Sequence, residues 1–262
     1  MKKYFLSVLS IFKNESHVLE EWLNHYINEG VEHFYLLNNN SDDNFMDIIK
    51  KYDKYIDLFD AKENHAQLKH LNSQFEKIKK ESEWLINVDL DEFLFAKENY
   101  KKIPDIINLL DSKIENLGVI KIPWIIFSSN NLIEQPSSVI KFFTDRKDFE
   151  KEESKNNQKY IAKTNLMTQI LVHGADTTGK IILSDGNIYN KNKFVIKDNI
   201  LEKQLLQLNH YVLQSKNWFM NVKCTRGAVR KGSIGVRNIN YFNEYNKIFS
   251  GYKDELLKNK IY

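Results

Sequence analysis

A short acidic run offers this chain's clearest candidates for chemistry. Residues 87–93 read Asn-Val-Asp-Leu-Asp-Glu-Phe and continue from the end of an apolar segment, residues 84–88. Asp89 and Asp91 are two residues apart, so their carboxylates point the same way if the extended conformation persists. Hard oxygen donors in this arrangement suit Mn²⁺ or Mg²⁺ shared with diphosphate oxygens. We predict Asp89 and Asp91 as metal ligands, Asp89 also as a nucleotide contact, and Glu92 as a catalytic residue that orients the pair or a substrate hydroxyl.

The acidic run has two other interpretations. Asp and Glu favour the first turn of a helix, so the run could simply mark a helix start. In phosphatases of the haloacid-dehalogenase type, an apolar strand is also followed by Asp-x-Asp, and the first Asp attacks phosphate. That motif usually continues with Thr or Val near the amino terminus, whereas here Glu92 follows and three predicted strands come first.

The first half of the chain alternates apolar runs with amphipathic stretches, which is typical of a parallel sheet covered by helices. The polar cluster of residues 38–43 follows the second of these runs. Open α/β sheets bind ligands at the carboxyl ends of their strands, so this cluster is a candidate binding loop. We predict strands at residues 4–12, 33–37, 56–59 and 84–88, and helices at residues 15–28, 45–52 and 65–80.

The pattern changes beyond Gly118, where short apolar runs have few helical stretches between them. We interpret this region as a mixed sheet that is followed by helices at residues 216–225 and 241–257. The charged run of residues 147–159 has no apolar periodicity and predicts a solvated loop or a lid over a substrate. The predicted strands are residues 119–122, 139–143, 160–162, 170–172 and 181–183.

The length and composition predict one domain. With 262 residues, of which 42% are apolar, the chain can bury one substantial core. Its net charge of +3, from 38 basic and 35 acidic residues, is too balanced to indicate nucleic-acid binding. We expect a single domain, residues 1–262, with a nucleotide-binding half at about residues 1–117 and an acceptor-binding half at about residues 118–262.

The cysteine content and the start of the chain bear on its location. The single cysteine, Cys224, excludes an intrachain disulfide and is typical of a reducing cytoplasm. Met1-Lys2-Lys3 and the apolar residues 4–12 superficially resemble a signal peptide, but no small-residue cleavage site precedes residues 13–15. No stretch reaches the roughly 20 apolar residues that cross a bilayer. We predict a buried first strand and a soluble, cytoplasmic protein.

Several motifs follow one another in a fixed order. They are Phe12-Lys13-Asn14-Glu15 ahead of Glu21-Trp22-Leu23, then Gly30-Val31-Glu32-His33-Phe34-Tyr35, Asn39-Asn40-Ser41-Asp42-Asp43, Asp89-Leu90-Asp91-Glu92-Phe93, and finally Asn209-His210-Tyr211 with Ser215-Lys216 and Arg226-Gly227. This set resembles the family 92 and related family 2 glycosyltransferases of GT-A fold, from about residue 5 to about residue 230. The resemblance implies an α/β fold of GT-A type, with a Rossmann-like, mostly parallel central sheet flanked by helices, a mixed-sheet acceptor region and C-terminal helices.

The resemblance also implies an activity. It is a metal-dependent hexosyl transfer from a nucleotide diphosphate donor, a UDP-sugar, to a glycan acceptor, with inversion and with Mn²⁺ or Mg²⁺ as cofactor. Bacterial relatives often build surface polysaccharide, which implies an envelope glycan as acceptor and peripheral contact with the inner face of the membrane.

By the same resemblance, Asn14, Glu15, Asn39, Ser41 and Asp43 would hold the nucleoside. Many family 2 enzymes have an aspartate where this chain has Asn39, although Asn can still donate to and accept from uracil. The polar cluster has another interpretation, an Asx-rich turn that serves its own backbone.

Histidines are further candidates. In GT-A enzymes a late histidine often completes the metal shell, which points to His210, and imidazole is a plausible ligand beside carboxylates. His173 is the competing candidate. Gln67 and His70, on the predicted helix before the fourth strand, would line the nucleotide pocket or lie on the surface.

Basic residues beyond His210 could balance the diphosphate. Arg226 would do so by paired hydrogen bonds, and Lys216 and Lys223 as point charges. The alternative is a solvated basic helix face. An inverting transfer also needs a carboxylate base, whereas a retaining one does not. We choose Asp176 as that base from the candidates Glu134, Asp145, Asp176 and Asp185, because it follows a predicted strand beside a His-Gly pair.

Two more functions compete with glycosyl transfer. A sugar nucleotidyltransferase would need a Gly-rich, basic first loop for triphosphate, which does not follow Phe12. A noncatalytic carbohydrate-binding or scaffold protein of the same fold would use aromatic residues such as Trp124 and Trp218 to stack on sugars, although most aromatic residues are explained by the core. Metal-dependent binding of a uridine nucleotide would distinguish the enzyme from the scaffold.

Overall fold

The computed structural model describes residues 2–150, 158–190, 195–226 and 237–262. Its first half alternates strands and helices, as the apolar pattern predicts. The four predicted strands and the first two predicted helices are confirmed. The elements are β1 (Tyr4–Phe12), α1 (Ser16–Asn28), β2 (His33–Asn38), α2 (Phe45–Lys51), the 3-10 turn η1 (Asp53–Tyr55), β3 (Ile56–Asp60), α3 (Gln67–Ser73), α4 (Phe75–Glu81) and β4 (Ser82–Asn87).

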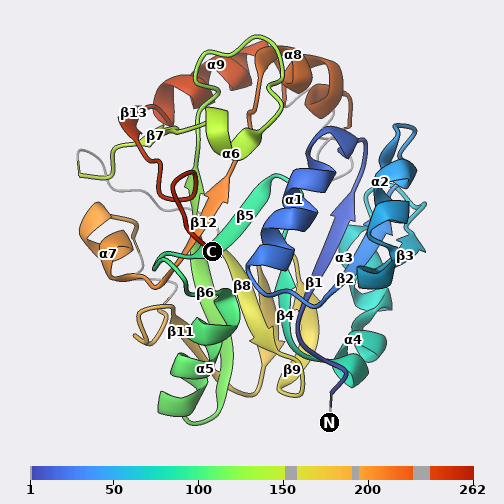
Figure 1. Ribbon diagram of the computed structural model, residues 1–262, viewed down its shortest axis with the longest axis vertical. Helices are drawn as coiled ribbons and strands as arrows, with labels where there is room; N and C mark the ends of the chain where they lie inside the picture. Colours follow the sequence, from blue (N-terminus) through green and yellow to red (C-terminus); the bar gives the residue numbers. More distant parts are fainter. Residues whose placement is uncertain (1, 151–157, 191–194, 227–236) are drawn as a thin grey trace.

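Both faces of this sheet are buried. Successive residues of a strand face opposite sides, so Val8 of β1 packs in the core under α1, and its neighbour Leu9 packs in the core under α3 and α4. Trp22 of α1 fills the first core and Leu71 of α3 the second. In Figure 1, α1 lies in front of the sheet. Burial on both faces explains why these strands read as continuous apolar runs.

The sheet order is β3-β2-β1-β4-β8-β6-β12-β5, with β11 paired to β6. The first four strands in this order pair in parallel, whereas β8 is antiparallel to both of its neighbours. Because β2 lies on one side of β1 and β4 on the other, the order reverses at β1, which is where open α/β sheets bind ligands. The later strands are β5 (Glu92–Ala96), β6 (Leu117–Ile126), β8 (Gln158–Lys163), β11 (Lys180–Leu183) and β12 (Leu206–His210).

The second half is a mixed sheet, as predicted, with two small antiparallel pairs beside it. These pairs are β9 (Met167–Leu171) with β10 (Gly174–Thr177), and β7 (Asp145–Lys147) with β13 (Gly251–Lys253). Figure 1 shows α8 and α9 at the top of the molecule and α5 at the bottom. The later helices are α5 (Ile103–Lys113), α6 (Val139–Phe142), α7 (Asp198–Lys203), α8 (Lys216–Trp218), the π-helical turn η2 (Phe219–Lys223), the 3-10 turn η3 (Cys224–Arg226) and α9 (Ile239–Ile248).

Three predictions of secondary structure were wrong. The predicted strand of residues 139–143 is instead helix α6 at residues 139–142, because the hydroxyl of Ser138 accepts a hydrogen bond from the backbone N–H of Lys141 and caps the helix. Residues 65–80 form two helices that meet at Gln74. The last predicted helix stops at Ile248, since Gly251 has a φ of 114° and leads into β13.

The charged run of residues 147–159 is described only at its ends. It begins at the end of β7 and finishes in β8. Residues 151–157 lie outside the described residues, so the predicted loop or lid falls largely on a segment that the structure does not describe.

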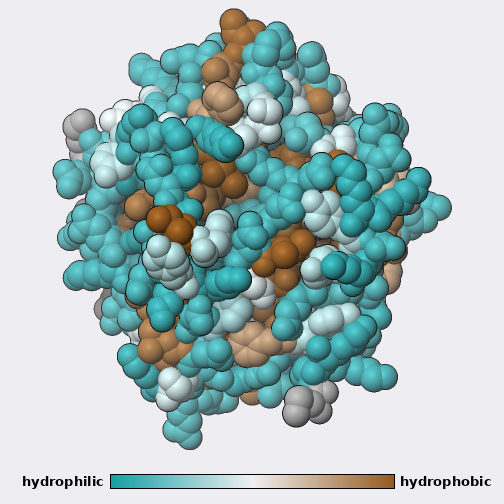
Figure 2. Space-filling model, in the orientation of Figure 1, coloured by the Kyte–Doolittle hydropathy of each residue, from teal (hydrophilic) through white to brown (hydrophobic). Residues whose placement is uncertain are grey.

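The described residues include no helix that is both long and apolar enough to cross a membrane. The face drawn in Figure 2 is mostly hydrophilic, with apolar side chains in small separate groups.

Candidate functional site

A cavity of about 510 Å³ lies at the carboxyl ends of β1, β2, β3 and β4. The ends of β6, β9 and β12 close its other side. The cavity therefore lies at the point where the strand order reverses. Of the residues proposed from the sequence, it brings together Glu15, Asn39, Gln67, Asp89, Asp91, Trp124, His173, His210, Lys223 and Arg226.

The acidic motif forms a turn between β4 and β5, and the extended conformation does not continue through it. Hydrogen bonds to its backbone carbonyls hold this turn in place. The indole N–H of Trp22 donates to the carbonyls of Asp89 (3.2 Å) and Glu92 (3.1 Å). The N–H of Tyr211 donates to the carbonyl of Asp91 at 2.8 Å. Both Asp89 and Asp91 line the cavity, but they differ in exposure, since their side chains are 36% and 5% exposed.

Asp91 is the buried carboxylate of the cavity. Its Oδ2 accepts a hydrogen bond from the ammonium of Lys223, and its Oδ1 lies 3.5 Å from Nε2 of His210. Burial alone would raise the pKa of Asp91, but the charge of Lys223 and the contact with His210 outweigh it and hold that pKa well below its usual value. Asp91 is therefore a stable anion inside the protein.

Lys159 of β8 occupies the other side of the acidic turn. Its Nζ lies 3.1 Å from Oδ2 of Asp89 and 3.4 Å from Oε2 of Glu92, and the side chain is only 1% exposed. Burial would lower the pKa of Lys159, but the two carboxylates raise it above its usual value. Lys159 was not among the residues predicted from the sequence. Its only signal there is a charge at the start of the predicted strand of residues 160–162.

Glu92, predicted to be catalytic, supports the turn from within. It is fully buried, does not line the cavity, and its Oε2 accepts the backbone N–H of Asp89 at 2.9 Å. Burial raises the pKa of Glu92 well above its usual value, although Lys159 opposes this. The geometry fits a positioning residue better than one that contacts a substrate.

The pairing of β12 with β5 sets the position of His210. His210 lies opposite Glu92 in this antiparallel register, which brings its ring to Asp91. His210 Nδ1 is buried and has no hydrogen-bond partner among the described residues. His173 lines the same cavity from beyond β9, with its ring 5.1 Å from that of Trp124. Of the two candidates, the structure brings His210 into contact with the acidic motif.

The loops after β1 and β2 are hydrogen-bonded to each other. The N–H of Asn14 donates to the hydroxyl of Ser41 at 3.0 Å, and the N–H of Ser16 donates to Asp43 at 2.7 Å. Asn14 has a φ of 53°, a conformation that Asn tolerates well. Asn14, Ser41 and Asp43 do not line the cavity, so their contacts fit the Asx-rich turn. Their predicted nucleoside contacts stay predictions.

Asn39 and Gln67 do line the cavity. The side-chain amide of Asn39 donates to the carbonyl of Ala61. Oε1 of Gln67 is buried without a hydrogen-bond partner among the described residues, which leaves an acceptor for an N–H group of a ligand. The ring Nε2 of His70 donates to the carbonyl of Glu63, 3.0 Å away, and His70 does not line the cavity.

Two basic residues reach the cavity from η2 and η3. Arg226 is bonded to Glu15 at 2.5 Å and to the carbonyl of Asn14, and its guanidinium lies 5.4 Å from the ring of Trp218. Lys223 lies 5.5 Å from the same ring. Lys216 is exposed and does not line the cavity, so its predicted diphosphate contact has no support from the geometry.

The candidate bases lie elsewhere. Asp176 is exposed on β10 and does not line the cavity, so its catalytic role stays a prediction. Glu134 is bonded to Asn217 at 2.6 Å, and Asp185 binds the N–H of Asn187 at 3.0 Å. Asp145 lines a separate cavity.

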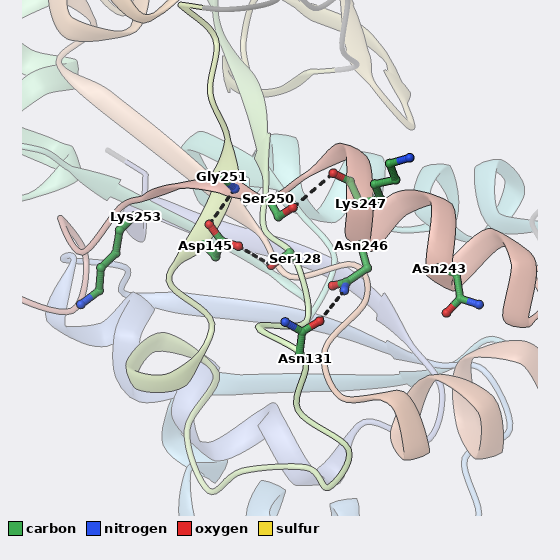
Figure 3. A pocket seen from close by; sticks show the side chains of 9 residues that line it. All are labelled: Ser128, Asn131, Asp145, Asn243, Asn246, Lys247, Ser250, Gly251 and Lys253. Carbon is green, nitrogen blue, oxygen red and sulfur yellow. Dashed lines mark hydrogen bonds between the residues drawn. The ribbon is translucent and has the colours of Figure 1, made fainter.

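That separate cavity, of about 570 Å³, lies among β7, α9 and β13 (Figure 3). Asp145 there accepts the backbone N–H of Gly251 at 2.9 Å and the hydroxyl of Ser128 at 3.4 Å. The amide of Asn246 donates to Asn131 at 3.0 Å. These polar groups satisfy one another, which indicates a structural role for Asp145.

The residue types of the main cavity suit a divalent cation, but its two aspartates are already paired with Lys159 and Lys223. Asp89, Asp91 and His210 all line the cavity, and two carboxylates with an imidazole form an acceptable donor set. Even so, no group of three or more His, Cys, Asp or Glu side chains in the described part of the chain is spaced to hold a metal ion. A cation at Asp91 would have to replace the ammonium of Lys223.

The fold and the cavity define an α/β protein with a cavity at the carboxyl ends of parallel strands, beside buried acids and bases. The model of glycosyltransferase family 92 matches residues 2–244 of the chain. The chain therefore belongs to glycosyltransferase family 92 and is an enzyme of the glycosyltransferase class. The predicted GT-A type of α/β fold is confirmed.

Solved structures resemble the chain only distantly. A crystal structure of S. aureus TarS 1-349 in complex with UDP is 16% identical, with a TM-score of 0.41, over 63% of this chain and 48% of that one. HddC from Yersinia pseudotuberculosis is 11% identical, with a TM-score of 0.37, over 76% of this chain and 96% of that one.

A glucosyl-3-phosphoglycerate synthase from Mycobacterium tuberculosis, in complex with Mn²⁺, UDP and phosphoglyceric acid, is 13% identical, with a TM-score of 0.31, over 63% of this chain and 57% of that one. The chain thus spans about half of the TarS chain and of the synthase chain. A comparison with curated proteins gave no match. The family match, and not these likenesses, assigns the class.

Proposed function

We propose that this enzyme transfers a hexose from a UDP-sugar to a glycan acceptor, with a divalent cation held at Asp89, Asp91 and His210. One observation carries the proposal: Asp91, His210, Lys223 and Arg226 meet in a single cavity at the switch point of the sheet. Departure of a nucleoside diphosphate builds up negative charge, and a cation with basic side chains would stabilise it.

The two sides of the cavity suggest where each part of the donor lies. Asn39 and Gln67 border the side at β2 and α3, and the open acceptor of Gln67 suits an N–H group of a base such as uracil. Lys223 and Arg226 line the cavity beside Asp91 and Glu15, where we place the diphosphate. Trp124 and His173 border the side towards β6 and β9, which leaves that side for the sugar and the acceptor.

The cation would be Mn²⁺ or Mg²⁺, which prefer carboxylate oxygens and phosphate. When bound, it would neutralise the leaving diphosphate. The protein's part is to hold Asp89 and Asp91 in a braced turn, through Trp22 and Glu92, and to place His210 by the β5–β12 register. Inversion at the transferred carbon, an envelope glycan as acceptor, and work at the inner face of the membrane stay predictions.

A thermal-shift screen would test the donor. We expect UDP and a UDP-sugar to raise the melting temperature with Mn²⁺ far more than without it, because a ligand that binds only the folded state stabilises it. GDP and CDP with Mn²⁺ are the matched controls for the base. If no nucleotide shifts the melting temperature in either condition, the proposed donor is wrong. Binding of UDP-sugar without release of UDP in the presence of acceptor glycans would favour the scaffold instead.

A further inference from the structure

Lys223 is a buried cation that faces the reaction cavity. It is the last residue of η2, its side chain is 8% exposed, and its ammonium donates to Oδ2 of Asp91. The ring of Trp218 lies beside the ammonium, at 5.5 Å. A buried ammonium is costly unless an anion pairs with it, so this contact belongs to the ground state of the free protein.

The acids in and under the cavity each have a basic partner from the chain. Lys159 pairs with Asp89 and with Glu92, and Lys223 with Asp91. Glu15, just after β1, pairs with Arg226 at 2.5 Å. The free cavity is therefore close to electrically balanced without any added ion, and a divalent cation gains less there than at bare carboxylates.

A bound nucleotide would offer Lys223 a new anion. The diphosphate of the proposed donor would enter the same cavity, and an ammonium on a flexible stem can turn from a carboxylate to a phosphate without a change in the backbone. Arg226 is less free to do so, since it is bonded at two points, to Glu15 and to the carbonyl of Asn14.

We propose that Lys223 is an exchangeable counter-ion: it neutralises Asp91 in the nucleotide-free protein and moves to the donor diphosphate, which frees Asp91 for the divalent cation. This rests on the proposed function, because the cation and the diphosphate are those of the transfer. Lys223 thereby couples the two ligands, so that the cation binds weakly until the nucleotide is present. Coupling of this kind is reciprocal and typically changes each affinity by about 5-fold to 150-fold.

The test measures Mn²⁺ binding to the nucleotide-free protein, by calorimetry or by electron paramagnetic resonance of free Mn²⁺. Lys223→Met removes the ammonium and keeps most of the length of the side chain. We expect the variant to bind Mn²⁺ alone at least about 10-fold more tightly than the wild type, within the usual range of coupling. Lys223→Gln retains a hydrogen bond to Asp91 without the charge and should give the same result if the Met variant does not fold.

The matched control is Lys50→Met, which removes an exposed lysine on α2, with a side chain that is 71% exposed, and should leave the Mn²⁺ affinity unchanged. Each Mn²⁺ titration is then repeated with saturating UDP. UDP should tighten Mn²⁺ binding to the wild type more than to either Lys223 variant.

Equal Mn²⁺ affinities of the wild type and a folded Lys223 variant, without nucleotide, would overturn the proposal. This outcome is separate from failure of the proposed function. If UDP binds to none of the proteins, the proposed donor is wrong, while the comparison with Mn²⁺ alone still decides whether Lys223 competes for Asp91.

Discussion

The charge of Asp91 is stabilised by two partners that come from distant parts of the chain. Lys223 binds one carboxylate oxygen, and His210 lies 3.5 Å from the other. Lys159 plays the same part for Asp89 and Glu92. The acidic motif is thus embedded among basic side chains, and its residues carry both stability and the proposed chemistry.

Replacing Asp91 with Asn should affect both properties. The loss of the carboxylate removes the proposed cation ligand, so we expect sugar transfer to fall at least about 100-fold, as for other groups that stabilise developing charge. Lys223 loses its anionic partner in a buried place, which should cost about 3 kcal/mol in the free energy of unfolding. Activity with Mn²⁺ and urea unfolding would measure the two effects.

The control for this change is Asp111→Asn. Asp111 pairs with Lys163 at 2.7 Å, but its side chain is 29% exposed and it does not line the cavity. A pair of this kind contributes about 0 to 1 kcal/mol, so the control should be nearly neutral in both measurements. Full activity of the Asp91 variant would show that sugar transfer does not require the Asp91 carboxylate.

Close packing between elements shapes the region beyond β6. Gly118, near the start of β6, and Gly179, just before β11, lie against each other, and the N–H of Lys180 donates to the carbonyl of Asn116 at 2.8 Å. A Cβ atom on Gly179 would lie 2.7 Å from Cα of Gly118 and 2.8 Å from the carbonyl oxygen of Asn116. Only glycine lets these two segments approach so closely.

We therefore expect Gly179→Ala to destabilise the protein. The clash is with backbone, so β11 must shift against β6, at a cost of about 1–3 kcal/mol. Gly174→Ala is the matched control, because its nearest contact, at 2.9 Å, is the far end of the Lys121 side chain, which can move aside. Urea unfolding should show a clearly larger loss for Gly179→Ala, and equal losses would contradict the role of this contact.

The packed core of the whole molecule keeps His25 neutral. His25 of α1 is buried beside β5, where Nε2 lies 2.8 Å from the carbonyl of Leu94, and Nδ1 lies 3.2 Å from the hydroxyl of Tyr262. Burial lowers the pKa of His25 to about 4.

This shift predicts acid sensitivity. The unfolded chain takes up a proton on His25 at about pH 6.5, and the folded chain only near pH 4, so stability falls as the pH drops through this window. Between pH 7 and pH 5 we expect His25 to remove about 2 kcal/mol from the free energy of unfolding. His25→Asn should flatten the pH dependence of urea unfolding, and parallel curves for the variant and the wild type would show that His25 does not titrate in this way.

Local sequence pattern was enough to predict β1 to β4, α1 and α2, because each depends on the spacing of apolar residues within a few turns or strand positions. The same pattern located Asp89 and Asp91 after a buried strand, and the order of motifs indicated the family that the full match confirms. It failed at residues 139–143, where an apolar run is too short to distinguish a strand from a helix and a cap at Ser138 decides.

The partners of those carboxylates were decided by tertiary structure. Lys159 is 70 residues from Asp89, and Lys223 is 132 residues from Asp91, so no local spacing relates them. Their contacts follow from the insertion of β8 beside β4 and from the return of the chain through β12 to η2. Sheet order and register are set by the packing of the whole core, and for this reason the acids were predictable from their neighbours in the chain while the lysines beside them were not.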